Sequence, residues 1–192
     1  TFNANLDKVF DIPPHVDDSY YGFTIHEIRE MQIMNMGNYA HGNQPIQHML
    51  YLYNWSGQPW KAQQRIREVM DKFYTCHPDG YCGAEDNGQT SAWYVFSALG
   101  FYPVCPATDQ YILGTPLFKK AEVSMSDGKT LLINAPDNGR ENFYVSGMKV
   151  NGRKYTRTYL EHDLLRKGTV IDFTMSDEPS KNRSVSQQDR PY

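Results

Sequence analysis

Residues 88–103 read GQTSAWYVFSALGFYP, and in this stretch one kind of secondary structure gives way to another. Its apolar side chains run with little interruption, which predicts a largely buried helix over 88–99. Gly100 and Pro103 then end the helix, because glycine favours the left-handed conformation after a helix and proline cannot continue one. Beyond Pro106 the sequence changes to short strand patterns.

Three further helices are expected before this stretch. The capping box Thr24–Glu27 predicts a helix over 24–36, with a hydrophobic staple between Phe23 and Ile28. Proline at a first helical position and glycine after the last predict the other two, which cover residues 45–57 and begin at Pro59.

The part after residue 106 predicts a small antiparallel sheet or sandwich. Strand patterns cover residues 121–125, 130–134, 142–145 and 169–175. The dipeptides Asp127-Gly128, Asn138-Gly139 and Asn151-Gly152 favour positive φ and are strong hairpin signals. The expected fold class is therefore α+β. A helical part covers residues 1–105, an antiparallel β module covers 106–175, and a polar, loosely ordered tail covers 176–192.

Composition excludes several classes of protein. The 192 residues carry a net charge of −3 and only 21% charged side chains, which argues against a basic nucleic-acid clamp. No apolar run reaches the ~20 residues of a membrane span, and the chain opens without a secretory signal pattern. Cys76, Cys82 and Cys105 lack the spacing of a zinc ribbon. Three small buried thiols are expected, with a Cys76–Cys82 disulfide as the alternative.

Two clusters near the predicted helices could carry chemistry. His26, Glu27 and Glu30 share one stripe of a helix, where Glu27 could instead be a capping residue and Glu30 a surface carboxylate. The sequence GAEDNGQ over 83–89 could present a carboxylate at a helix start, as a general base requires. The alternative is that Asp86 is the N-cap of that helix.

A third cluster reads HGNQP over 41–45, with His48 one turn further on. Asn43 or Gln44 could be a helix cap, and His48 could be a core histidine. Amides, carboxylates, imidazoles and aromatic rings together suit polyhydroxylated ligands, because ring faces stack on sugars and polar groups bind hydroxyls. Aromatic residues make up 14% of the chain, and most precede residue 119.

Several long motifs resemble glycoside hydrolase family 92. They are DIPPHVDDSYYGF at 11–23, the helix at 26–31, GNQP at 42–45, YLYNWSGQPWK at 51–61 and GQTSAWYVFSALGFYPV at 88–104. This family comprises calcium-dependent exo-α-mannosidases that invert the anomeric centre. The resemblance implies a β-sandwich joined to an (α/α)6 toroid. This chain would then supply the C-terminal helices of the toroid and a small β module.

The resemblance also implies roles for individual residues. Asp86 matches the family's general base, and Ala84 stands where many relatives carry an aspartate that pairs with the base. Calcium is implied as the cofactor, with Glu30 and Asn43 as its ligands. The implied substrate contacts are His26, Glu27, Asn43, His48 and Glu85.

The resemblance implies that this chain is the C-terminal part of an inverting exo-α-mannosidase acting on α-1,2-linked mannosides. The general acid is expected outside these residues, in the N-terminal part of the same enzyme, so the isolated chain is expected to be inactive. The expected partners are α-mannoside glycans, and the expected location is periplasmic or extracellular. The alternative is a non-catalytic carbohydrate-binding or interaction module built on the same scaffold.

Overall fold

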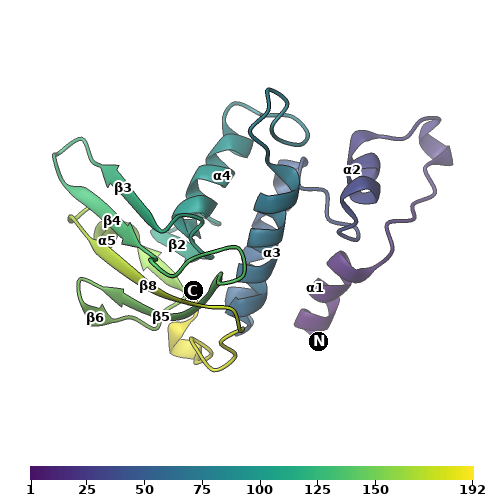
Figure 1. Ribbon diagram of the computed structural model, residues 1–192. Helices are drawn as coiled ribbons and strands as arrows, with labels where there is room; N and C mark the ends of the chain where they lie inside the picture. Colours follow the sequence, from purple (N-terminus) through teal and green to yellow (C-terminus); the bar gives the residue numbers. More distant parts are fainter. The chain divides into compact units, whose positions relative to one another are not determined.

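The computed structural model describes all 192 residues and combines helices with sheets, as the α+β prediction requires (Figure 1). The α-helices are α1 (Phe2–Asp11), α2 (His26–Met34), α3 (Pro59–Phe73), α4 (Gln89–Leu99) and α5 (His162–Leu165). The 3-10 helices are η1 (Ser19–Tyr21), η2 (Gln44–Asn54) and η3 (Gln187–Asp189). The toroid and the rest of the enzyme remain predictions.

The strands follow α4 in the chain. They are β1 (Phe101–Tyr102), β2 (Gln110–Leu113), β3 (Lys120–Ser124), β4 (Thr130–Asn134), β5 (Tyr144–Val150), β6 (Arg153–Lys154), β7 (Tyr159–Glu161) and β8 (Val170–Ser176). Strands follow the helices as expected, although β1 already begins at Phe101, before the change expected beyond Pro106. Helix α3 begins at Pro59 and α4 ends at Leu99, at the positions that proline and glycine predict.

The chain forms two compact units. Unit 1 consists of Thr1–Met49 with Glu68–Trp93, and unit 2 of Leu50–Arg67 with Tyr94–Tyr192. This division passes through α3 and α4, whereas the domain boundary expected after residue 105 follows the change from helix to strand. The predicted domain boundaries therefore remain a prediction.

In unit 1, α2 begins later than the capping box predicts. Its N-cap is Ile25, which has no side chain for a capping bond, and the Thr24 hydroxyl donates to the Asp18 carboxylate instead, at 2.5 Å. Phe23 is exposed, so the predicted staple to Ile28 is also wrong. The helix is anchored instead through buried Ile28 and Met31 on its inner face.

Helix α1, which no sequence signal suggested, buries Leu6 and Phe10 in the same unit. The predicted second helix forms as η2, a 3-10 helix rather than an α-helix. The first backbone bond at its start, from the Ile46 N–H to the Asn43 carbonyl at 3.1 Å, already has the i→i+3 spacing.

Unit 2 contains two sheets, one with strand order β1-β2-β7 and one with order β3-β4-β8-β5-β6. The hairpins at Asp127-Gly128 and Asn151-Gly152 are confirmed. The expectation of a purely antiparallel module is wrong at one position, because β4 pairs with β8 in parallel.

The third predicted hairpin, at Asn138-Gly139, does not form, because β8 lies between β4 and β5 in the sheet. The Asn138 side chain is buried and has a different role. Its amide oxygen accepts a bond from Arg67 at 3.0 Å, and its amide nitrogen donates to the Leu117 carbonyl at 2.7 Å.

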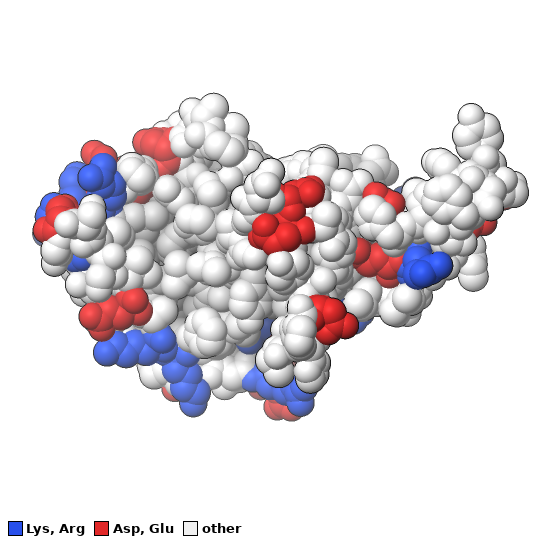
Figure 2. All heavy atoms as spheres, turned by 90° about the horizontal axis from the view of Figure 1, so that it is seen from above, with Lys and Arg blue, Asp and Glu red and all other residues white.

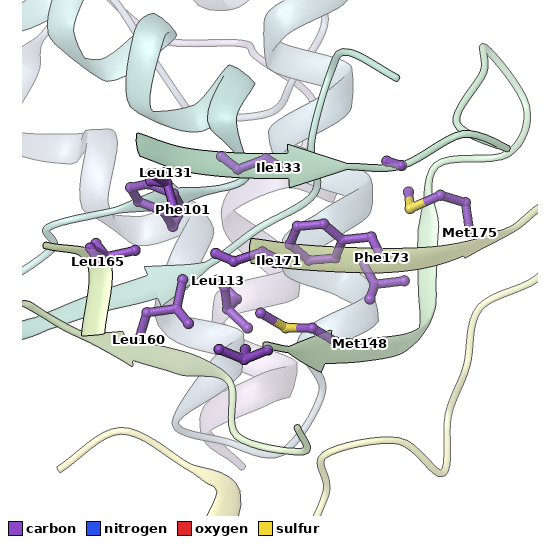
Figure 3. Close-up of a cluster of buried hydrophobic side chains, with 13 residues drawn as sticks. Phe101, Leu113, Leu131, Ile133, Met148, Leu160, Leu165, Ile171, Phe173 and Met175 are labelled. Atoms are coloured by element: carbon purple, nitrogen blue, oxygen red, sulfur yellow. The ribbon is translucent and has the colours of Figure 1, made fainter. Parts of the chain in front are cut away.

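Side chains from both sheets meet in one hydrophobic cluster, as Figure 3 shows. Phe101, Leu113 and Leu160 come from the three-stranded sheet, and Ile171 and Phe173 from the central strand of the other. Burial of this apolar surface is the main force that holds unit 2 together. The shared core agrees with the sandwich alternative of the prediction.

Helix α4 is less buried than its composition predicts. Trp93 is fully buried in unit 1, and Ser97 and Ala98 are buried in unit 2, but Ala92 is exposed and Val95 is 56% exposed. The helix therefore has an apolar face that is exposed. Because both faces carry apolar residues, the sequence pattern could not indicate which of them is buried.

The polar tail after residue 176, which was expected to be loosely ordered, instead makes several contacts within unit 2. The Thr158 N–H donates to the Asp189 carbonyl at 2.7 Å, and Arg190 donates to the Val185 carbonyl at 2.9 Å. The Tyr192 N–H reaches the Gln110 side chain at 3.3 Å.

All three cysteines are free, but the expectation that they are buried is wrong for Cys76 and Cys105, which are exposed. On the face seen in Figure 2, basic and acidic side chains are interspersed. No helix of this chain has both the length and the apolar character needed to cross a bilayer.

Candidate active site

All the residues singled out from the sequence lie in unit 1. They come from three segments: α2, residues 40–49, and residues 82–88 before α4. Local hydrogen bonds and close backbone contacts join these segments, so residues far apart in sequence share one region of the fold.

Helix α2 contributes one half-buried carboxylate, Glu27, and one buried carboxylate, Glu30. The His26 imidazole lies 3.3 Å from the Glu27 carboxylate in the first turn, and the His26 side chain is 63% exposed. Glu30, one turn later, is 8% exposed, so its predicted alternative as a surface carboxylate is wrong. Both Glu30 carboxylate oxygens accept from the Gly42 N–H, at 2.9 and 3.1 Å.

Burial dominates the electrostatics around Glu30. It raises the pKa of this carboxyl above its usual value, although the Gly42 N–H and His26 act in the opposite direction. The Cys82 thiol is a further partner of the carboxyl group, and burial raises its pKa to about 12, with the Glu30 charge contributing. The Glu30 carboxyl group and the Cys82 thiol are therefore hydrogen-bonded partners in a largely buried environment.

The segments around Gly42 and Gly83 approach so closely that neither residue has room for a side chain. A Cβ on Gly83 would lie 2.4 Å from the Gly42 carbonyl oxygen. A Cβ on Gly42 would lie 2.4 Å from a Glu30 carboxylate oxygen and 2.9 Å from the Gly83 Cα. This contact brings the segment that carries Asn43 against the loop that carries Asp86.

Glu85, rather than Asp86, caps helix α4. Its carboxylate accepts from the Gly88 N–H and, at 3.3 Å, from the Ser91 N–H. Bonding to the Ser91 side chain, followed by the Gly88 N–H, holds the pKa of Glu85 below its usual value. The alternative that placed Asp86 at the N-cap is therefore wrong.

The Asp86 side chain is left exposed by this arrangement. Asp86 and Asn87 have φ values of 50° and 56°, and Gly88 follows at 100°, so three consecutive residues adopt left-handed backbone. Left-handed conformation costs non-glycine residues roughly 1–2 kcal/mol each, less for Asp and Asn. The Asp86 carboxylate makes no hydrogen bond or ion pair within the chain and is open to solvent.

The histidine that could have been a core residue, His48, is exposed, and another histidine is buried instead. His48 is exposed and its ring lies 2.9 Å from the Pro45 carbonyl, so it is not a core residue. His41 is the core histidine. It is fully buried between the hydroxyls of Tyr39 and Tyr74, at 2.7 and 2.8 Å, and burial lowers its pKa to about 3. Asn43 is exposed beside it in the chain.

Sequence reasoning missed the hydrogen bonds that Gln44 and Thr90 make to the loop before α4. The Gln44 amide donates to the Ala84 carbonyl at 2.6 Å and to the Thr90 hydroxyl at 3.0 Å. The GNQP motif contained the signal, but Gln44 was considered only as a helix cap.

The residues of this chain do not by themselves fit a calcium site. No group of three His, Cys, Asp or Glu side chains gathers in a metal-binding arrangement. Both Glu30 oxygens already accept from the Gly42 N–H, which leaves fewer of their lone pairs for a cation. A hard cation such as calcium prefers six to eight oxygen ligands, which Glu30 and Asn43 do not supply.

Comparison with known proteins relates this chain to one family of glycoside hydrolases. The sequence pattern of the "Glycosyl hydrolase family 92 catalytic domain" matches residues 1–177. An "Uncharacterized secreted glycosidase" of Arthroderma benhamiae is 26% identical over 142 residues, covering 72% of this chain and 18% of the relative.

Two solved structures from Bacteroides thetaiotaomicron are more similar. A family GH92 inverting mannosidase of strain VPI-5482 is 50% identical with a TM-score of 0.83, over 99% of this chain and 26% of the other. A family GH92 α-mannosidase in complex with mannoimidazole is 39% identical with a TM-score of 0.89, over 100% of this chain and 24% of the other. This chain thus spans about a quarter of each solved relative, and it belongs to glycosyl hydrolase family 92 as a part of the catalytic domain.

Proposed function

We propose that this chain is the part of an inverting exo-α-mannosidase that supplies the general base, Asp86. The observation that carries the proposal is the exposed, unpartnered Asp86 carboxylate, on a loop whose neighbouring carboxylate, Glu85, is already occupied as a helix cap. The relatives described as an inverting mannosidase and as a mannoimidazole complex support this reaction and this substrate class.

In an inverting reaction, a carboxylate removes a proton from water as the water oxygen attacks the anomeric carbon. A carboxylic acid about 6.5–9.5 Å away protonates the leaving oxygen on the opposite face. Asp86 suits the first role because its carboxylate is exposed and free of competing bonds within the chain. We assign the acid to a part of the enzyme that this chain does not span, so the isolated chain is expected to release no mannose.

The remaining residues are proposed to act around this base. His26 and Glu27 would contact the leaving-group sugar of an α-1,2-linked mannoside, and exposed Asn43 and His48 would bind hydroxyl groups. Glu85 would act on the loop rather than on sugar, since backbone and Ser91 groups occupy its carboxylate.

We propose that calcium binds only where residues outside this chain complete its set of ligands. Glu30 and Asn43 would then lie at the edge of its site, and we assign no step of the reaction to the ion. A chelator should therefore reduce activity of the full-length protein, and added calcium should restore it, without changing the fold of unit 1.

The test uses the full-length protein with α-1,2-mannobiose and NMR detection of the first product. The expected product is β-mannose. Asp86→Asn should lower kcat by roughly 10²–10⁴-fold, the usual contribution of a general base. Asp79→Asn is the matched control, because Asp79 is also exposed and lies in the turn before this loop. Initial release of α-mannose, or full activity of Asp86→Asn, would contradict the proposal.

Ala84 favours a second candidate function. The resemblance implies that an aspartate at this position would assist the base as a second carboxylate, and here a methyl group stands in its place. A non-catalytic carbohydrate-binding or interaction module would tolerate this change. Calorimetry with mannose distinguishes the two, because binding by a full-length protein that hydrolyses no mannoside favours the module. Ala84→Asp should raise kcat if the protein is an enzyme.

We also propose that the protein acts in the periplasm or outside the cell. The description of the Arthroderma relative as secreted supports this location. Fractionation of cells that express the full-length protein tests it, and a cytoplasmic location would contradict it.

A further inference from the structure

We propose that Gln44 and Thr90 are positioning residues that hold the loop over 83–88, so that the Asp86 carboxylate keeps one place relative to substrate. This inference deepens the proposed function, since it rests on Asp86 as the base. All the residues involved belong to unit 1.

The three groups form a closed triangle of hydrogen bonds. The Gln44 amide nitrogen donates to the Ala84 carbonyl at 2.6 Å and to the Thr90 hydroxyl at 3.0 Å. The Thr90 hydroxyl in turn donates to the same carbonyl at 2.9 Å. The amide uses both its hydrogens and the carbonyl both its lone pairs, so the donor side of Gln44 has to face the loop.

The triangle joins the loop to rigid neighbours. Thr90 is fully buried in the first turn of α4, and its carbonyl accepts from the Tyr74 hydroxyl at 3.2 Å. Gln44 lies 40 residues before Ala84 in the chain, at the start of η2. The loop is therefore held by two elements at a point two residues before Asp86.

Because residue 84 is alanine, the hydrogen bonds to its backbone carbonyl matter more for holding the loop than they would beside a polar side chain. A methyl group offers no hydrogen bond, so Ala84 is held only through its backbone and the contact at Gly83. Asp86 and Asn87, which follow, adopt left-handed backbone that residues other than glycine leave readily unless surrounding contacts hold them. Loss of the triangle should therefore let the base move.

A positioning role predicts a specific kinetic result. Displacement of a base by about 1 Å can cost roughly 10²-fold in rate, while substrate contacts elsewhere are unchanged. Gln44→Glu keeps the size of the side chain but places an oxygen against the Ala84 carbonyl. Thr90→Val keeps the shape and removes the hydroxyl, and Thr90→Ser keeps the hydroxyl.

The experiment measures kcat and KM of the full-length protein on 4-nitrophenyl α-mannoside, with and without azide. Azide is an anion, so it attacks the anomeric carbon as 4-nitrophenolate departs, and no proton has to be removed. Asp86→Asn marks the loss of the base in the same assay. Gln64→Glu is the control for the change of charge, because Gln64 is exposed on α3. Hydrogen exchange of the peptide over 83–93 reports on the loop without any substrate.

We expect Gln44→Glu and Thr90→Val to lower kcat by roughly 10- to 100-fold with KM within about threefold. Azide should restore turnover with β-mannosyl azide as the product, exchange in 83–93 should become faster, and Thr90→Ser and Gln64→Glu should resemble wild type. Unchanged hydrolysis, or a loss that azide does not rescue, would overturn the positioning role.

If the wild-type protein hydrolyses no mannoside, the proposed function fails, and hydrogen exchange alone decides whether Gln44 and Thr90 hold the loop. Unchanged exchange in Gln44→Glu then overturns the inference, and faster exchange supports it.

Discussion

Two glycine-to-alanine substitutions can separate the cost of left-handed backbone from the cost of the close contact beside the candidate base. Gly22 and Gly83 have similar φ values, +70° and +64°. A Cβ on Gly22 meets nothing within 4 Å, whereas a Cβ on Gly83 would lie 2.4 Å from the Gly42 carbonyl oxygen and 2.6 Å from its Cα. Both substitutions therefore carry the same conformational penalty, and only one forces the backbone to move.

The expected magnitudes follow from these two contributions. Gly22→Ala should reduce the free energy of unfolding by about 1–2 kcal/mol, the cost of left-handed alanine. Gly83→Ala should add an overpacking cost of about 1–3 kcal/mol, giving roughly 2–5 kcal/mol in total.

Urea unfolding followed by tryptophan fluorescence measures both losses, since Trp93 is buried in unit 1 with its ring centroid 4.3 Å from that of His41. Equal losses for the two variants would refute the close contact between the segments.

Three further predictions concern buried polar groups. Burial raises the folded-state pKa of Glu30, so the unfolded chain releases this proton first and wild type should lose stability as pH rises above the ordinary value of 4.5. Glu30→Gln should remove this loss while still accepting the Gly42 N–H, so urea titrations of the two proteins should diverge above that pH and converge below it. Arg67→Met should cost about 2–4 kcal/mol in the same assay, because the Pro116 carbonyl and Asn138 amide oxygen lose their buried donor. Tyr51→Phe should cost about 1–2 kcal/mol by leaving the Ser97 hydroxyl unpaired, and adding Ser97→Ala should recover part of the loss.

Local signals predicted the helices of this chain better than the sheets. Pro59 and Gly100 bound α3 and α4 because proline and glycine act on the backbone within one or two residues. The parallel pairing of β4 with β8 joins residues 38 positions apart, as Leu132 with Val170 shows. A strand pattern does not specify its partner, so no local reading of the sequence could predict this pairing.

The candidate site shows the same limit. The motif around Asp86 predicted a carboxylate at the start of a helix. The predicted capping residue was Asp86, whereas the carboxylate that caps α4 belongs to Glu85, one residue earlier. The cap falls on Glu85 because Asp86, Asn87 and Gly88 adopt left-handed backbone, which turns the Glu85 side chain toward the N–H groups of α4. The bond from Gln44 to Ala84 spans 40 residues and has no local signature.

Three carboxylates of unit 1 differ in their burial and in the hydrogen bonds that occupy their oxygens, and these differences indicate different roles. Glu30 is buried and both its carboxylate oxygens accept from the Gly42 N–H, so it is suited to holding the Gly42 segment and is shielded from solvent water. Glu85 is ionised, but its charge stabilises the start of α4, where the helix dipole favours a negative group. Of the three, only Asp86 has a carboxylate that is both exposed and free of bonds within the chain. A base must spend its lone pair on water, so the two occupied carboxylates make Asp86 the site from which this chain could act on a sugar.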